Sequence, residues 1–210
     1  MNKLNFILIT LVSIIIINSV PKESAYGFNE LVNELNNYIK FEETGVKVEY
    51  EINQNKEEVL EDIKNKFIDK YKYQKYILKD NEISIITNNE VIVADIFEDN
   101  MTTLVEIRII NYDNEKSLSK LMKELTELQN NNAKKLKYFQ FFKGKIINKE
   151  RVLNEIYKTQ KLKNIETLDI HNGYVGTARL NNGQRVNFVD NSYDTGSYFI
   201  IGTPIIFATY

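Results

Sequence analysis

The sequence offers few side chains that could perform catalysis or bind a metal. Cysteine is absent from the 210 residues, which excludes disulfides, thiolate nucleophiles and cysteine-ligated metals. The single histidine, His171, lies in the predicted turn His171-Asn172-Gly173, where a surface role is commoner than catalysis or metal binding. There is no Gly-x-Ser-x-Gly turn, metal-binding histidine pair or phosphate loop. We therefore predict no catalytic residue, no metal and no cofactor from motifs.

Paired carboxylates are the remaining catalytic candidates. Asp95 and Glu98 are one such pair, and two suitably separated carboxyl groups can hydrolyse a glycosidic bond. The chain contains 29 acidic residues, so close spacings between them are common by chance. Their separation in space is not fixed by the sequence, and a carboxylate-based hydrolase stays open as an alternative.

Basic residues gather between Lys116 and Lys163, in predicted helices and the strand between them. The densest part of this segment includes five lysines: Lys134, Lys135, Lys137, Lys143 and Lys145. Two interpretations are open. The lysines form either a solvated face or a patch that binds an anionic envelope polymer or lipid headgroups.

A second candidate surface lies on a predicted hairpin that turns at Asn182-Gly183 and pairs Leu180 with Arg185. This register would place four residues on one face of the sheet: Gly176, Ala178, Arg185 and Asn187. Three apolar residues would lie on the other face: Val175, Val186 and Phe188. The small, polar face is either a shallow binding surface for a peptide or glycan or the solvent side of the sheet.

Residues 1–25 differ from the rest of the chain, because Lys3 is followed by the apolar run Leu4–Ile17. A run of about 14 residues has the length of a signal-peptide core and is short of the roughly 20 residues that span a bilayer. A cleaved signal peptide, an uncleaved membrane anchor and a buried strand or helix remain open. In the first two cases the protein is exported, and it is then secreted or anchored to the outer face of the cytoplasmic membrane through this segment alone.

The segment Lys56–Ile63, KEEVLEDI, recurs as Lys149–Ile156, KERVLNEI, with five of eight positions identical. Each copy follows a predicted strand, precedes three or four more strands, and lies in a half that begins with a helix. Residues 26–113 and 114–210 therefore predict two tandem α+β repeats of the order helix, strand, helix, antiparallel strands. We expect the repeats to form one compact body with a pseudo-two-fold axis and helices on one face of a curved sheet.

The spacing of apolar residues locates the individual elements. Helical spacing predicts helices near 27–39, from 56, across 118–128 and from 149, with Asn55 and Asn148 as N-caps. Alternation predicts strands at 46–52, 71–78, 83–87, 91–97, 103–112, 136–142, 165–170, 174–180, 185–189 and 198–210.

The C-terminal stretch Tyr198–Ile206, YFIIGTPII, resembles the closing signature of the YwmB family of exported proteins from spore-forming Gram-positive bacteria. The length, the N-terminal segment and the similar halves agree with this resemblance. It implies a fold similar to that of the TATA-box-binding protein. It implies no established activity, cofactor or functional residue.

A fold of that kind does not by itself indicate DNA binding. A DNA-binding sheet needs basic side chains, because neutralisation of phosphates supplies most of the affinity. Between Glu82 and Asp113 the only basic residue is Arg108, among seven acidic ones. We therefore expect no nucleic-acid partner.

These observations favour a non-enzymatic exported module that binds a cell-envelope polymer or an envelope protein on its sheet face. The alternative is a carboxylate-based hydrolase of cell-wall glycan. A deep cleft with two facing carboxylates would favour the hydrolase, whereas a broad open sheet face rimmed by aromatic residues would favour the binding module. The oligomeric state is not predicted.

Overall fold

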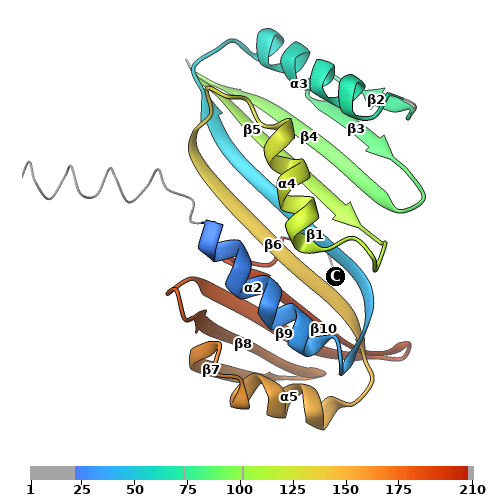
Figure 1. Ribbon diagram of the computed structural model, residues 1–210, viewed down its shortest axis with the longest axis vertical. Helices are drawn as coiled ribbons and strands as arrows, with labels where there is room; N and C mark the ends of the chain where they lie inside the picture. The colour runs from blue at the N-terminus through green and yellow to red at the C-terminus, as the bar shows by residue number, and fades with distance from the viewer. Residues whose placement is uncertain (1–21, 73, 101, 208–210) are drawn as a thin grey trace, which may run out of the picture.

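One ten-stranded antiparallel sheet forms the body of the molecule, and helices cover one of its faces (Figure 1). The computed structural model describes residues 22–72, 74–100 and 102–207, with the side chains of residues 22–26, 149–151 and 153 excepted. Of the segment that predicts export, residues 1–25, residues 1–21 lie outside the described residues, and residues 22–25 begin α2 (Lys22–Leu35). Within them, no helix combines the length and the apolar character needed to cross a bilayer.

The elements follow one another in an order that occurs twice. The first series is α2 (Lys22–Leu35), β1 (Ile39–Ile52), α3 (Lys56–Lys70), β2 (Tyr76–Leu78), β3 (Glu82–Ile86), β4 (Glu90–Asp99) and β5 (Thr102–Asn111). The second series is α4 (Leu118–Leu128), β6 (Lys134–Ile146), α5 (Lys149–Lys158), β7 (Leu162–Ile170), β8 (Gly173–Leu180), β9 (Arg185–Tyr193) and β10 (Gly196–Thr203).

The strand order is β2-β3-β4-β5-β1-β6-β10-β9-β8-β7. Read outward from the centre, the strands of the first series are β1, β5, β4, β3 and β2, and those of the second are β6, β10, β9, β8 and β7. β1 and β6 pair antiparallel in the middle of the sheet. The strands of the two series thus occupy corresponding places on either side of the β1–β6 contact.

The hydrophobic core lies between the sheet and the helices. In Figure 1, α2 and α4 cross the central strands, while α3 and α5 lie toward the two ends of the sheet. The N-cap prediction for α3 is confirmed, since the Asn55 side chain accepts a hydrogen bond from the Glu58 amide at 2.8 Å. The repeated segments lie in α3 and α5, where Val59 and Ile63 are buried as Val152 and Ile156 are. The side chain of Leu153, expected on the same stripe, lies outside the described residues.

Two predicted strands agree closely with the structure. In β5 the predicted alternation is confirmed, because Val105, Ile107 and Ile109 are buried in the core and Glu106 and Arg108 are on the other face. The predicted hairpin at Asn88-Asn89 is also confirmed: the Thr87 amide donates to the Glu90 carbonyl at 2.8 Å, and Ile85 pairs with Ile92.

The boundary between the first helix and strand was predicted wrongly. Ile39, expected at the end of the helix, begins β1, which continues through the predicted break at Glu43 to Gly45. β1 pairs on both sides, with β5 and β6, and a bulge between Phe41 and Glu43 absorbs the irregularity. The predicted strand 71–78 is reduced to β2, because Tyr71 caps α3 through its amide and the Gln74 amide donates to the Tyr71 carbonyl in a turn.

The predicted register of the β8–β9 hairpin is wrong by one residue. Leu180 exchanges hydrogen bonds with Gln184 and Gly183, so Arg185 pairs with Arg179 and Val186 pairs with Ala178. Gly183 has φ +86°, a conformation that glycine adopts without strain and that permits this shorter loop. As a consequence the four residues of the predicted surface are divided. Gly176 and Ala178 face the helices, and Arg185 and Asn187 lie on the other face.

We predict that Gly176→Ala destabilises the protein. A Cβ at this position would lie 2.2 Å from Cζ of Phe188, a fully buried ring on the neighbouring strand. Overpacking of this kind costs about 1–3 kcal/mol, which urea denaturation would measure. The matched control is Gly27→Ala in α2, where the new methyl group has its nearest neighbour at 4.0 Å and a helix favours alanine. Equal stability of the two variants would contradict the prediction.

Candidate functional site on the helix-free face

The face of the sheet opposite the helices, hereafter the helix-free face, carries the features that could bind a ligand. Side chains alternate between the two faces along each strand. A residue that follows or precedes one packed in the core therefore points to the helix-free face. Its middle is covered by the C-terminal segment. A groove and a small pocket lie on the β6–β7 side of the sheet.

The C-terminal segment Pro204–Phe207 folds back over the middle of the helix-free face. The Asn187 amide group donates a hydrogen bond to the Pro204 carbonyl, and the Thr203 hydroxyl donates to the Arg185 carbonyl at 2.7 Å. The ring of Phe207 packs edge-on against Phe141, with ring centroids 5.0 Å apart. Phe207 thereby anchors the segment on aromatic side chains of β6.

Lys47 lies beneath this segment and is only 8% exposed. Its ammonium group is 2.8 Å from Glu49 Oε1 and 3.1 Å from Glu106 Oε2. It also lies 4.5 Å from the centroid of the Phe139 ring and 5.5 Å from that of Phe207, within the range of a cation–π interaction. The buried charge of Lys47 is therefore balanced by two carboxylates and two rings.

The predicted carboxylate pair does not form a site. Asp95 lies on the helix-free face, and Glu98, three residues further along the same strand, points to the opposite face. Instead Asp95 pairs across the sheet with Glu106, and both bind Arg108, at 2.9 and 2.8 Å. Burial raises the pKa of Asp95, and the nearby Arg108 opposes that shift. The Asp95–Glu106 pair was not predicted, because it depends on the register of β4 with β5.

The five predicted lysines all lie on β6, beside β1, where Lys145 pairs in register with Lys40. Lys143 forms an ion pair with Glu43 at 3.2 Å and Lys135 with Glu51 at 2.7 Å. The remaining three have polar or acidic neighbours as well: Lys145 donates to the Thr195 carbonyl at 2.7 Å, Lys137 pairs in register with Glu49, and Lys134 pairs with Glu51. Two of the five lysines, Lys143 and Lys135, thus have their charge balanced by an ion pair within the sheet.

The predicted hairpin surface retains only two residues on the helix-free face. Arg185 is exposed there, and Asn187 holds the C-terminal segment through Pro204. Ala178 is buried on the helix-covered face and cannot contact a ligand. His171 is exposed in the turn between β7 and β8, as predicted.

A groove of about 540 Å³ runs between the C-terminal segment and strands β7 to β9. Apolar side chains form much of its lining: Leu168, Val175, Val189 and Ile206. Glu166, Thr177 and Asn187 add polar groups. Leu168 is 67% exposed although it lies in the middle of a strand, so this part of the sheet presents apolar surface to the solvent.

A smaller pocket of about 160 Å³, hereafter the tyrosine pocket, lies beside the β9–β10 hairpin. It is lined by seven residues from four strands: Glu42, Lys143, Val189, Asn191, Tyr193, Tyr198 and Ile200. The rings of Tyr193 and Tyr198 have centroids 6.0 Å apart and planes inclined at 59°. This pocket was not predicted from the sequence. The alternation of Val189, Asn191 and Tyr193 before a glycine-containing turn was the signal available.

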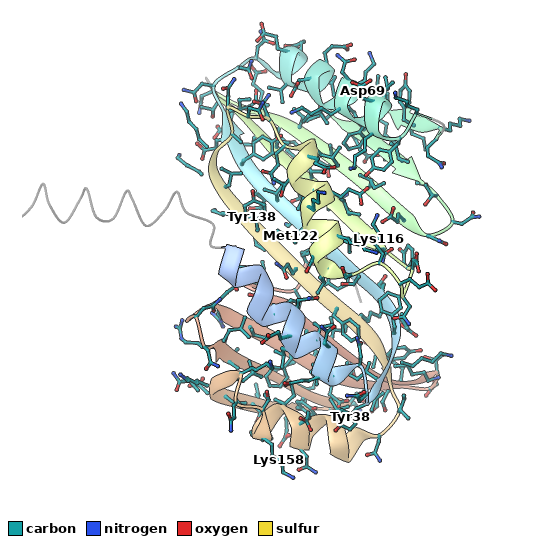
Figure 2. All side chains as sticks on the ribbon, viewed as in Figure 1. Tyr38, Asp69, Lys116, Met122, Tyr138 and Lys158 are labelled. Atoms are coloured by element: carbon teal, nitrogen blue, oxygen red, sulfur yellow. The ribbon has the colours of Figure 1, made fainter. Side chains whose placement is uncertain are left out.

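On the helix-covered side, polar and charged side chains form a network that holds neighbouring elements of the fold together. Lys116, labelled in Figure 2, forms ion pairs with Glu90 of β4 and Glu124 of α4. The Tyr71 hydroxyl donates a hydrogen bond to Glu124. The network joins α3, α4 and β4, and its charged groups are paired with one another.

Comparison with known proteins adds little. No family model and no curated protein matches the sequence. Among solved structures, the crystal structure of DynU16, a protein of the dynemicin biosynthetic locus, is similar at a TM-score of 0.24 and 7% sequence identity, over 76% of this chain and 86% of that chain. A likeness at this level supports no conclusion about fold or function.

We predict that Phe207→Ala loosens the C-terminal segment. The substitution removes the ring that packs on Phe139 and Phe141, and for a partly buried phenylalanine we expect a loss of about 1–3 kcal/mol in the free energy of unfolding. Urea denaturation and the binding of a hydrophobic dye would measure the loss and the newly exposed surface. Ile205→Ala, at an exposed position of the same segment, is the control. An unchanged unfolding midpoint for Phe207→Ala would refute the anchoring role.

We also predict that Lys116→Met destabilises the protein more at neutral than at acidic pH. Burial already raises the pKa of Glu90 above its ordinary value, and Lys116 limits that shift. A carboxyl whose pKa is raised in the folded state loses stability as pH rises from its unfolded pKa through its folded pKa. Without Lys116 this shift grows, so the deficit should be largest near pH 7 and smaller at about pH 4.5.

The measurement is urea denaturation of both proteins at the two pH values. Lys120→Met, at an exposed position of α4, should show no such pH dependence. A deficit that is equal at both pH values would mean that Lys116 acts by packing alone.

Proposed function

We propose that this protein is a non-enzymatic binding module of the cell envelope and that it binds its partner through the helix-free face. The observation that carries the proposal is the exposure of large apolar side chains on strands of that face: Ile77, Ile86, Phe97, Leu168, Ile170 and Tyr193. A sheet face that only contacts water alternates toward polar residues. Leu168, Ile170 and Tyr193 lie on β7 and β9, beside the groove and the tyrosine pocket, and exposed apolar surface in such a place is typical of a binding site. Ile77, Ile86 and Phe97 lie on β2 to β4, at the other end of the sheet.

The charge of this face supports a neutral partner rather than a nucleic acid or an anionic polymer. The lysines of β6 lie against the glutamates of β1, and Arg108 is held between Asp95 and Glu106. Binding to phosphates requires positive groups that are free to exchange their counterions. Three cations of the central strands, Lys47, Lys135 and Lys143, already have acidic partners.

The hydrolase alternative has weaker support. Asp95 and Glu98 face opposite sides of β4, and the carboxylates of Asp95 and Glu106 are both held by one arginine. A glycosidase needs one carboxyl as proton donor and the other free to attack the sugar or to activate water. Arg108 restrains both carboxylates of the pair Asp95–Glu106, which face each other in the register of β4 and β5.

We further propose that the two halves of the chain arose by internal duplication and that the sheet is a pseudo-two-fold arrangement like that of the TATA-box-binding protein. The repeated segments in α3 and α5, with Val59 and Ile63 matched by Val152 and Ile156, support this origin. Export and membership of the YwmB family belong to the same proposal and rest on the N-terminal apolar run and the Tyr198–Ile206 stretch.

The test is binding of the purified full chain to cell-wall and membrane fractions, measured by co-sedimentation. We expect the double variant Leu168→Lys with Ile170→Lys, on the helix-free face of β7, to lose at least about tenfold in affinity. The controls are substitutions at exposed positions of the helices, Ile68→Lys on α3 and Lys158→Glu on α5. Asp69 and Lys158 in Figure 2 mark these surfaces.

Equal binding by the face variant and by the controls would overturn the proposal. So would binding that falls steeply with salt, because it would assign recognition to the lysines of β6 instead of the apolar surface.

A further inference from the structure

We propose that the tyrosine pocket is a saccharide-binding subsite that takes one neutral pyranose ring of an envelope glycan. This inference rests on the proposed function, because it names a ligand class for the same face of the sheet. Four features of the pocket favour this ligand: its size, its two tyrosine rings, one unsatisfied amide oxygen and the balance of charge around it.

The size of the pocket suits a single ring. Its volume of about 160 Å³ exceeds the roughly 10–15 Å³ that one water molecule occupies on the same measure. It is below the roughly 300–1,000 Å³ of sites that enclose a whole drug-sized ligand. Val189 and Ile200 supply its apolar surface, and the rest of a longer chain would continue along the open sheet.

The two tyrosines provide a surface for the apolar side of a sugar. Tyr193 is 46% exposed and Tyr198 is half-buried, so a ligand can reach both rings. The carbon-bound hydrogens on one side of a pyranose ring form a flat apolar patch that packs on an aromatic ring, while the phenol hydroxyl remains available for hydrogen bonds. The 59° inclination of the rings makes two walls of a notch rather than one flat stack.

The amide of Asn191 supplies a hydrogen-bond acceptor without a donor. Its Nδ2 group donates to the Tyr193 hydroxyl at 2.8 Å, which leaves the Tyr193 proton free to donate in turn. The Asn191 Oδ1 atom is buried, and none of the described residues donates a hydrogen bond to it. A buried acceptor without a partner is costly. In this conformation Oδ1 is closed to solvent, so a ligand hydroxyl would satisfy it once the Asn191 side chain turns toward the pocket.

The charges around the pocket select against an ionic ligand. Glu42 and Lys143 line it, Glu43 forms the ion pair with Lys143, and Lys145 is adjacent on β6. Two negative and two positive charges leave the site formally neutral. Tyr112, which is also exposed, lies near this ion pair: burial raises its pKa, with Glu43 adding to the shift and Lys143 opposing it. Neutral hydroxyl-bearing rings suit this combination of aromatic, amide and balanced charged groups better than phosphates do.

The experiment is titration of the full chain with chitotriose, and separately with maltotriose, in a detergent that carries no sugar headgroup. Isothermal calorimetry gives the affinity, and saturation-transfer NMR identifies the sugar protons that contact the protein. We expect at least one of the two saccharides to bind and Tyr198→Ala to weaken that binding by at least about tenfold, since it removes a stacking wall. Tyr193→Phe should retain stacking and lose only part of the affinity.

The matched control is Tyr157→Ala, which removes an exposed tyrosine of α5 from the other side of the molecule. Asn191→Ala provides a second variant of the pocket should Tyr198→Ala fail to fold, as judged by its circular dichroism. Absence of binding by both saccharides would overturn the inference. Binding that Tyr198→Ala and Asn191→Ala leave unchanged would overturn it as well.

The two proposals can fail separately. If the chain binds envelope fractions through the apolar surface around Leu168 and Ile170 but binds neither saccharide, the subsite is wrong and the proposed function stands. If a saccharide binds at the tyrosine pocket while the envelope fractions are not retained, the general function is wrong and the subsite stands.

Discussion

The antiparallel contact between β1 and β6 is the interaction on which the rest of the structure depends. These two strands lie at the middle of the sheet. Each pairs on its other side with a strand of its own series, β1 with β5 and β6 with β10. On the helix-free face, glutamates of β1 lie beside lysines of β6 toward both ends of the contact, as in Glu43 with Lys143, and Lys47 lies beside Phe139 between them. Exposed ion pairs contribute little stability, typically below about 1 kcal/mol each. Their effect here is to favour one register over its neighbours, because a shift by one residue would separate the charges.

Much of the fold could be predicted from local pattern. The alternation in β5, the hairpin between β3 and β4, and the Asn55 cap of α3 depend on residues that are close together in the sequence. The β8–β9 register depends on the turn at Gly183, where a loop of three residues and a loop of four are both compatible with the sequence. One residue more or less in such a loop exchanges the two faces of a strand, and this exchange put Ala178 on the wrong side.

The candidate site was less predictable than the fold, because its residues meet only through contacts between distant parts of the chain. Lys143 was predicted to belong to a basic patch. In the structure β6 lies beside β1, and Lys143 contacts Glu43, a hundred residues away in sequence. The tyrosine pocket combines Glu42 of β1 with Tyr193 and Tyr198 of a hairpin near the end of the chain. No local spacing relates these residues. Their types, aromatic and polar on alternate strand positions, were visible, but their assembly required the order of the strands.

The two ends of the described chain leave the molecule on different sides. α2 begins at Lys22 in the helix layer, and Phe207 packs against the aromatic residues of β6 on the opposite side of the sheet. A mechanical tether at the beginning of the chain would therefore pull on the helix layer and leave the other face unobstructed. A bulky fusion at the end of the chain would be held directly over the sheet. The position of an added label thus decides which surface of the protein can still be approached.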